Sequence, residues 1–212
     1  MIDKIRSKLH SFAWDLLEKL YRAYVGVSMS ILSRVDFGKN VYDRDWDVLI
    51  VLDTARVDAM KEISPEFDFI NEVGSIRSLG STSSEWIAKT FVERYTDEIE
   101  DTSLLSANPH VQHTLYDRQF PEHDKDAIFA FTSWDTVQPE DFEYIEQPWQ
   151  YVTNERYDHV LPEDMTDRAV SLYREQNPDR MIVHYMQPHR PHIAQAYKED
   201  RELTNAERDP FT

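Results

Sequence analysis

The sequence has no cysteine, few glycines and no long apolar run, and each absence excludes a class of function. Without cysteine there is no disulfide, no thiolate metal ligand and no cysteine nucleophile, including a formylglycine made from cysteine. The four glycines form neither a phosphate-binding P-loop nor a dinucleotide fingerprint, and Gly-x-Ser-x-Gly is absent. The longest uncharged stretch near the N-terminus, residues 23–33, is far shorter than the roughly 20 residues that span a bilayer.

Basic residues are also scarce. Among 212 residues there are 40 aspartates and glutamates against 23 lysines and arginines, eight of them lysine, and the net charge is −17. A surface this acidic repels phosphate backbones, so we expect no nucleic acid among the partners. Many carboxylates with little lysine are typical of halophilic proteins, because concentrated salt screens the self-repulsion. The first residues lack the apolar core and cleavage site of a signal peptide, which favours a cytoplasmic protein.

Residues 1–34 have the pattern of one amphipathic helix, and residues 1–38 are expected to form this helix with a linker. Apolar side chains recur every three or four residues, namely Ile5, Leu9, Phe12, Leu16, Leu20, Tyr24, Val27 and Ile31. The helical segment carries six basic and three acidic residues, so its charge of +3 leaves −20 for the remainder. We expect the helix to pack on its own domain; the alternatives are docking to a protein or, peripherally, to an anionic membrane.

Residues 39–212 alternate between apolar runs and helical patterns. Strands are predicted at residues 47–52, 102–106, 127–131 and 181–186, and helices at residues 55–63, 83–95 and 163–176. Strands that are apolar throughout and separated by helices indicate a mostly parallel sheet that is covered on both faces. The prediction is an α/β fold, a three-layer α/β/α sandwich, in which ligands bind beyond the carboxyl ends of the strands.

Asp53 ends the first of these apolar runs, Asp47-Val-Leu-Ile-Val-Leu-Asp53. A carboxylate at the carboxyl end of a strand can point into the crevice and bind Mn²⁺, Mg²⁺ or Zn²⁺. It can equally cap the helix that follows. A single aspartate does not distinguish these two roles.

Thr82 lies in Gly80-Ser-Thr-Ser-Ser-Glu-Trp86, at the predicted start of a helix. A hydroxyl there meets the positive end of the helix dipole, which stabilises its alkoxide and any anionic ester that it attacks. Thr82 followed by Glu85 also fits a capping box, in which the threonine caps the helix and the glutamate reaches back. Position alone leaves cap and nucleophile open.

Together the two motifs resemble the first half of alkaline phosphatase and sulfatase superfamily hydrolases, in particular the sulfatase-like branch that uses a threonine to transfer phosphorus-containing groups from lipids. The resemblance covers roughly residues 45–192 and, with the acidic composition, suggests a haloarchaeal-type member. It implies that Asp53 and Thr82 share a divalent cation, Mn²⁺, Zn²⁺ or Mg²⁺, alone or beside a second one, and that Thr82 is the nucleophile. The expected substrate is a small-molecule, glycan or lipid ester.

A third motif, His184-Tyr-Met-Gln-Pro-His189-Arg-Pro-His192, is similar to a strand-end segment of sulfatase-like proteins, where Pro-His lies near the substrate. The resemblance makes His189 the first candidate for holding an ester oxygen. His184, His192 and Arg56 are further substrate-binding candidates, and a second metal would recruit His189 or His192. The residues alone also fit a loop whose path two prolines fix, with a structural histidine at position 184.

Two features of the family are missing from the sequence. Its Asp-His pair on a later strand has no equivalent, because His123-Asp124 has the reverse order and Asp158-His159 follows no strand pattern. The Cys/Ser-x-Pro-x-Arg signature of sulfatases is also absent. The leading hypothesis is therefore a metal-dependent hydrolase or transferase of phosphate or sulfate esters with a threonine nucleophile. The alternative is a non-catalytic or truncated member, incomplete at its C-terminus, that serves in binding or assembly.

Overall fold

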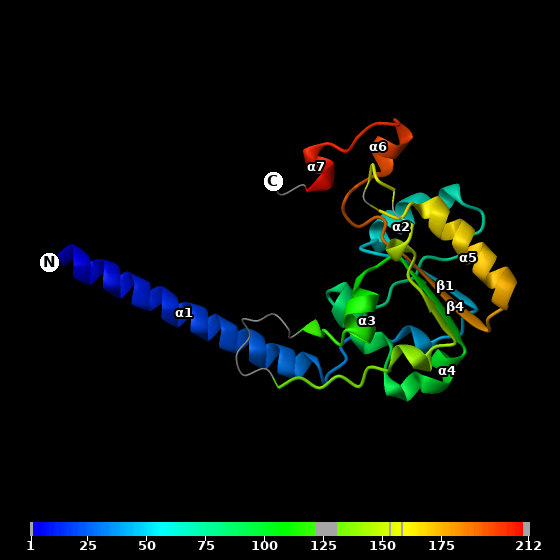
Figure 1. Ribbon diagram of the computed structural model, residues 1–212. Helices are drawn as coiled ribbons and strands as arrows, with labels where there is room; N and C mark the ends of the chain where they lie inside the picture. The colour runs from blue at the N-terminus through cyan, green and yellow to red at the C-terminus, as the bar shows by residue number, and fades with distance from the viewer. Residues whose placement is uncertain (1, 122–130, 153, 158, 210–212) are drawn as a thin grey trace.

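The computed structural model describes residues 2–121, 131–152, 154–157 and 159–209, in which helices surround a four-stranded sheet (Figure 1). The α-helices are α1 (Ile2–Leu32), α2 (Val57–Ile63), α3 (Ser83–Thr90), α4 (Thr96–Glu100), α5 (Pro162–Gln176), α6 (Ala194–Lys198) and α7 (Asn205–Arg208). The strands are β1 (Val48–Leu52), β2 (Thr102–Ser106), β3 (Tyr144–Glu146) and β4 (Arg180–Tyr185). Short 3₁₀ turns and a π-helical turn, Gln112–Tyr116, connect them.

The four strands run parallel in the order β1-β4-β2-β3. β1 and β4 are neighbours, with Leu52 opposite Tyr185. β2 pairs with the other side of β4, which places Ser106 opposite His184. Because the strands are parallel, their carboxyl ends share one edge of the sheet. Residues that follow β1, β2 and β4 therefore meet there, although they are far apart in the sequence.

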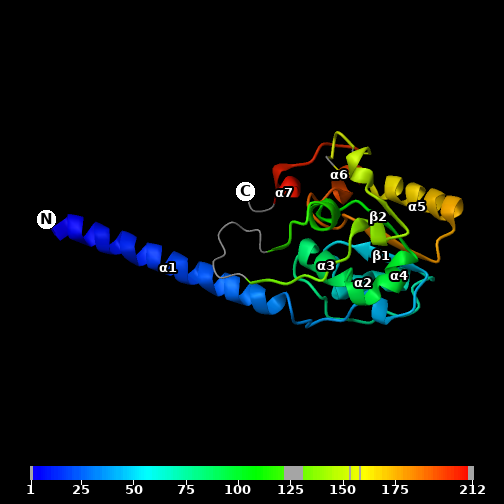
Figure 2. The same cartoon turned by 60° about the horizontal axis from the view of Figure 1, so that its bottom comes forward.

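The sheet separates two apolar cores. Successive residues of a strand point to opposite faces, so Leu104 of β2 packs toward α3 and α4, whereas Leu105 packs toward α5. Figure 2 shows α5 on one side of the strands and α3 and α4 on the other. Fully buried residues of the first core include Ile87, Phe91, Ile99, Leu115 and Ile182, and those of the second include Met165 and Leu172. The predicted α/β/α fold with a parallel sheet is confirmed. The expectation that the sheet is covered on both faces is wrong at β1, where Val48, Ile50 and Leu52 are exposed.

Predicted and observed elements agree best where apolar runs are long. β1, β2, β4, α2 and α5 begin and end within two residues of the predicted bounds. The helix predicted at residues 83–95 is too long, because the chain leaves helical geometry at Phe91 and Val92 forms a bridge to Thr136. β3 has only three residues and was not predicted. The strand expected at residues 127–131, except Phe131, and the pair His123-Asp124 lie outside the described residues.

α1 projects from the domain instead of packing along it (Figures 1 and 2). Its last turns are joined to the domain by hydrogen bonds: the backbone N of Phe131 donates to Ser30 Oγ at 2.7 Å, and that of Ser133 donates to Ser33 Oγ at 3.1 Å. The apolar stripe from Leu16 to Ile31 is exposed, so the expectation that this face packs on its own domain is wrong. Within the described residues, no helix combines the length and apolarity needed to cross a bilayer.

Candidate functional site

Asp53 follows β1 at the carboxyl edge of the sheet, where its backbone N donates to the Tyr185 carbonyl of β4 at 3.2 Å. The next residue, Thr54, has a φ of 65°, a left-handed conformation that β-branched residues rarely adopt. The chain turns away from the sheet at this point. Strain of this kind, about 1–3 kcal/mol, is concentrated at functional sites, so the turn marks this edge of the sheet as a candidate site.

Side chains from three other segments surround the Asp53 carboxylate. Its Oδ2 accepts hydrogen bonds from Ser83 Oγ at 3.0 Å and from Asn108 Nδ2 at 2.7 Å, and His184 Nε2 lies 3.9 Å away. Asn108 is fixed in turn, because its backbone N donates to the Ser106 hydroxyl at 3.1 Å. The start of α3, the residues after β2, and β4 thus converge on one carboxylate.

Thr82 and Glu85 shape the start of α3. The Thr82 hydroxyl accepts a hydrogen bond from the Glu85 backbone N at 3.2 Å and so caps the helix. The Glu85 carboxylate accepts from the backbone N and the hydroxyl of Ser81 at 2.8 and 2.9 Å. In a capping box the glutamate would instead accept from the backbone N of the cap residue, Thr82. Thr82 therefore has the structural role expected of a cap. Its hydroxyl proton is not used by that contact and can be donated elsewhere.

His184 is a buried and uncharged histidine. Its ring packs edge-on against Trp86 of α3, with centroids 5.8 Å apart, and its Nδ1 lies 3.2 Å from the Ser106 hydroxyl. Burial lowers the pKa of His184 to about 4; the negative charge of Asp53 opposes this shift and His110 adds to it. At neutral pH the contact between His184 and Asp53 is therefore not an ion pair, and the imidazole is available as a proton acceptor.

His110 and His189 complete the polar surface of the site. The backbone N of His110 donates to Asn108 Oδ1 at 2.9 Å, which holds the turn after β2. Partial burial and the neighbouring His113 lower the pKa of His110, and Asp53 counteracts them. His189 Nδ1 lies 2.8 Å from the Arg190 carbonyl. Imidazoles in these positions can donate hydrogen bonds to anionic oxygens.

These groups line one cavity of about 540 Å³. The candidates named from the sequence that line it are Asp53, Thr82, His184 and His189. Lining residues that the sequence analysis missed include Ser83, Trp86 and His110, and Asn108 was missed as a partner of Asp53. A signal for the turn from 108 to 110 was present, because it follows β2 in the way that position 53 follows β1.

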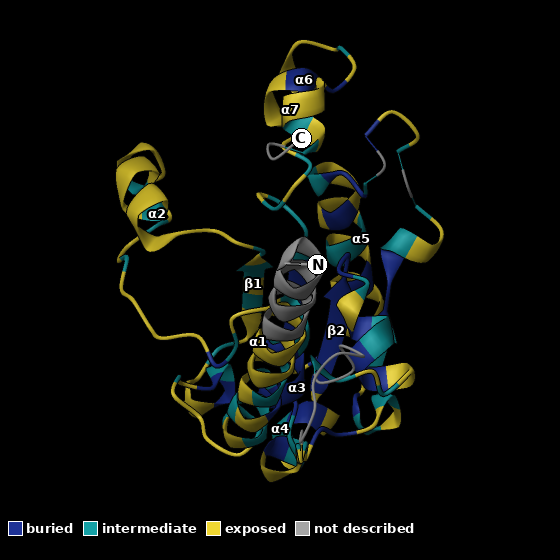
Figure 3. Cartoon of the chain, turned by 90° about the vertical axis from the view of Figure 1, so that its left-hand side faces the viewer, coloured by how far each residue is buried: buried dark blue, intermediate teal, exposed yellow. Residues whose placement is uncertain are grey.

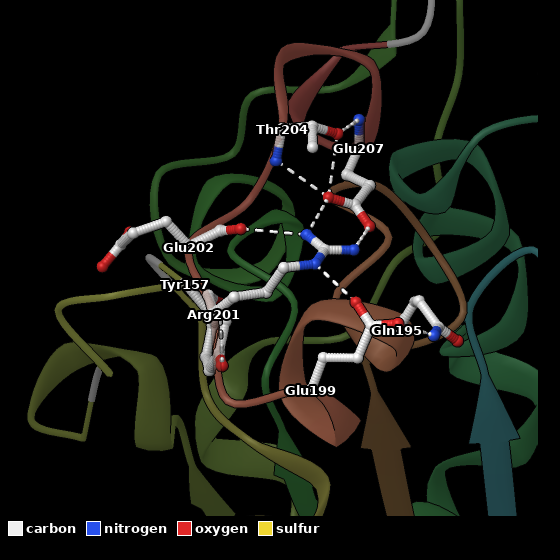
Figure 4. Close-up of polar contacts among 7 residues, drawn as sticks. All are labelled: Tyr157, Gln195, Glu199, Arg201, Glu202, Thr204 and Glu207. Carbon is white, nitrogen blue, oxygen red and sulfur yellow. Dashed lines mark hydrogen bonds and ion pairs between the residues drawn. The ribbon is translucent and has the colours of Figure 1, made fainter.

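Two predicted substrate-binding residues lie elsewhere. Arg56 is exposed, and its guanidinium donates to both carboxylate oxygens of Asp58 at 2.8 and 2.6 Å. The backbone N of His192 donates to the Glu207 carbonyl at 2.9 Å. Glu207 belongs to a C-terminal segment that is held by its ion pair with Arg201 (Figure 4). Neither Arg56 nor His192 is among the residues that line the cavity.

The described residues do not complete a metal site. Asp53 contributes one carboxylate, and its Oδ2 already accepts hydrogen bonds from Ser83 and Asn108. Across the described ranges, no group of three or more histidine, aspartate or glutamate side chains could hold an ion, whereas Zn²⁺ takes about four ligands and Mg²⁺ about six. Asp53 and Thr82 alone would therefore hold a cation weakly, and the cation expected there stays a prediction. The roles described below are those of the protein side chains.

Comparison with family models, with curated proteins and with solved structures gives no match for this chain. The site is therefore interpreted from its own geometry. That geometry includes a carboxylate, the three consecutive hydroxyls of residues 81–83 and three imidazoles around one cavity at the carboxyl edge of a parallel sheet. Hydroxyls are nucleophiles once a base accepts their proton, and imidazoles bind anionic oxygens.

Proposed function

We propose that this protein is a hydrolase or transferase of phosphate or sulfate esters that acts through the hydroxyl of Thr82. The observation that supports the proposal is the convergence of Asp53, Thr82 and two cavity-lining imidazoles, His110 and His189, which come from four separate segments. A cavity of about 540 Å³ has the size of sites that bind small molecules. It suits a small ester, a terminal sugar ester or the head group of a lipid.

Each group has a role in this reaction. Thr82 Oγ1 forms a bond to phosphorus or sulfur while the bond to the leaving ester oxygen breaks, and water or an acceptor alcohol then takes the group from the threonine. His110 and His189 hold the anionic oxygens by hydrogen bonds, which strengthen as charge builds up in the transition state. The neutral imidazole of His184 and the carboxylate of Asp53 are the proton acceptors that line the cavity.

Ser83 is a competing nucleophile. Its hydroxyl donates directly to Asp53 at 3.0 Å, whereas the Thr82 hydroxyl accepts from a backbone amide. Ser83 is therefore the hydroxyl already paired with a carboxylate. Thr82 is preferred because it precedes the first turn of α3, where the unpaired backbone amides of the helix face an incoming anion.

Two observations favour a second candidate function, a binding module without catalysis. The described residues supply no complete metal site, and Thr82 has a structural role as the cap of α3. A cavity lined by imidazoles and hydroxyls would still bind an anionic ester. The two functions predict the same ligand and differ in turnover.

The experiment that separates these functions measures nitrophenol release from aryl phosphate, phosphodiester and sulfate esters in concentrated KCl, with Mn²⁺, Zn²⁺, Mg²⁺ or a chelator. Thr82→Ala removes the hydroxyl and the cap, whereas Thr82→Ser keeps both. We expect Thr82→Ala to lower kcat by about a thousandfold or more and Thr82→Ser to retain much of the activity. Ser83→Ala keeps the nucleophile and should lower kcat by about tenfold.

Three outcomes would change this conclusion. If Ser83→Ala abolishes turnover and Thr82→Ala does not, Ser83 is the nucleophile. If both variants remain as active as the natural protein, the reaction does not occur in this cavity. If the folded protein turns over none of the esters under any condition but binds inorganic phosphate through His110 and His189, it is a binding module.

A further inference from the structure

The apolar face of α1 has no covering partner in the described structure. Leu20, Tyr24, Val27 and Ile31 are 58%, 69%, 50% and 54% exposed. They repeat at steps of three and four residues, so they lie along one side of the helix. An isolated helix in water is marginally stable, and most helices are stabilised by burying such a face. We therefore expect a partner to cover the exposed stripe.

The spacing of the stripe disfavours a coiled coil between two copies of α1. From Ile5 to Ile31 the apolar residues advance 26 positions in seven steps, about 3.7 residues per step, against the 3.5 of a left-handed coiled coil. On such a coil the stripe would rotate out of the seam by roughly 150° over this length. On a straight helix it drifts by about half as much, which keeps it on one broad side. A flat surface matches this face better than a narrow seam does.

Charge favours a lipid surface over a second copy. Residues 1–34 carry +3 and the remainder carries −20, so two copies brought together would repel each other through their acidic domains. The acidic domain does offer an apolar groove between β1 and α5, but its volume of about 270 Å³ is far too small to receive a helix of 31 residues. A basic amphipathic helix instead matches an anionic bilayer, which attracts its lysines and arginines.

Aromatic side chains extend this face. Tyr24 is exposed within the stripe, and Phe131, which lies beside Val27 and Ile31, is exposed as well. Tryptophan and tyrosine are favoured at the boundary between lipid head groups and acyl chains, because their rings combine an apolar body with a polar tip. Figure 1 shows that α1 extends away from the domain, so the helix can lie on a surface while the acidic domain stays in water.

We propose that α1 binds in the plane of an anionic lipid bilayer, with the stripe from Leu16 to Ile31 facing the acyl chains. The helix does not cross the bilayer; it holds the domain at the surface. This proposal does not depend on the chemistry of the Asp53 cavity. It also gives a lipid-attached or membrane-proximal ester an advantage as a substrate, because the site and the surface would be kept together.

The test compares two double variants of the full chain. Leu20→Glu with Val27→Glu places two charges on the stripe, and Tyr21→Glu with Ser28→Glu places the same two charges one residue further along, about 100° around the helix. Both lower the net charge equally, so repulsion from anionic lipid is matched. Flotation is measured with vesicles of phosphatidylcholine alone or mixed with phosphatidylglycerol, in about 0.1 M and about 1 M KCl, after circular dichroism has shown that all chains are folded.

We expect the natural chain to float with the anionic vesicles and the stripe variant to lose about tenfold or more in partitioning. The control variant should lose about threefold or less. Higher salt should reduce the preference for anionic lipid while the difference between the variants persists, because salt screens charges and leaves apolar burial in place. Equal losses in both variants, or no flotation of the natural chain, would overturn the proposal. So would light scattering that shows a dimer which the stripe variant abolishes.

Discussion

Two consecutive segments border the candidate site and differ sharply in packing. Residues 54–78, which we call the arm, contain α2 and have no buried residue, and α2 stands apart from the sheet in Figure 3. α3, which follows within a few residues, is mostly buried against the first core. Both segments line the cavity, the arm through Thr54, Ala55 and Ser78 and α3 through Ser83 and Trp86.

The difference in burial predicts different roles for α3 and the arm. The candidate reactive groups are tied to α3. Thr82 and Ser83 lie at its start, and Asp53 is hydrogen-bonded to Ser83. Reactive groups work best when packing fixes their geometry. The arm has no buried residue, so we expect it to open at lower free energy than α3. We expect chemistry to depend on α3 and ligand selectivity to depend on the arm.

The largest predicted contrast lies between one ion pair in each segment. Lys89 and Glu85 of α3 are 3.5 Å apart and only 4% and 9% exposed, whereas Arg56 and Asp58 of the arm are 2.6 Å apart but 77% and 66% exposed. We expect Lys89→Met to lower the free energy of unfolding by about 3–5 kcal/mol, because it leaves Glu85 buried without its counter-charge. Arg56→Met should cause no measurable loss, although its contact is shorter, because water and salt screen an exposed pair.

Urea denaturation monitored by tryptophan fluorescence measures both effects. A double variant, Lys89→Met with Glu85→Gln, is the control, because it removes the buried charge as well. It should recover part of the stability that Lys89→Met loses. Similar losses for Lys89→Met and Arg56→Met would mean that the arm is packed as firmly as α3, which would contradict the comparison.

A smaller contrast concerns pH. Burial lowers the pKa of His184 from 6.5 to about 4, and in the arm the hydrogen bond from Arg56 lowers the pKa of Asp58 to about 2. Between pH 6.5 and 4 the unfolded chain binds a proton at His184 that the folded chain does not. Above pH 6.5, His184 therefore does not affect the pH dependence of the free energy of unfolding. As the pH decreases from 6.5 toward 4, protonation of this histidine in the unfolded chain lowers the free energy of unfolding by roughly 3 kcal/mol.

The measurement is the midpoint of urea unfolding at a series of pH values for the natural chain and for His184→Gln. The variant cannot titrate at this position, so its stability should decline less between pH 6.5 and 4. Asp58→Asn in the exposed arm should follow the curve of the natural chain. Parallel curves for the natural chain and His184→Gln would show that this histidine is not buried against Trp86.

The sequence was sufficient for the parts of the fold that apolar runs determine. β1, β2 and β4 are continuous apolar or buried segments, and α5 has a clear helical period. β3 was not predicted because three residues are too few to show a hydrophobic periodicity. The packing of α1 was also mispredicted, because amphipathic periodicity shows that a face is apolar and does not show what covers it.

The site could be predicted in outline only. Asp53 and His184 were found because they lie at or near strand ends, and the strand order β1-β4-β2 brings these ends together. That order depends on long-range pairing, which no local pattern contains. Ser83 and Asn108 were missed because their importance lies in hydrogen bonds to Asp53 across 30 and 55 positions of sequence. The same limit leaves the choice between Thr82 and Ser83 to experiment.

The smallest predicted contrast is between two glycines. A Cβ on Gly80 would come within 2.3 Å of the Trp86 backbone N in α3, whereas a Cβ on Gly74 in the arm would have no heavy atom within 4 Å. We expect Gly80→Ala to lower the free energy of unfolding by about 1–3 kcal/mol, since backbone must move to admit the methyl group. Gly74→Ala should be neutral or slightly stabilising, because it restricts only the unfolded chain. Urea unfolding of the two variants compares the same methyl group on both sides of the cavity. If Gly80→Ala were tolerated as well as Gly74→Ala, the loop before Thr82 would not be held against α3, and the fixed position of the proposed nucleophile would lose its structural basis.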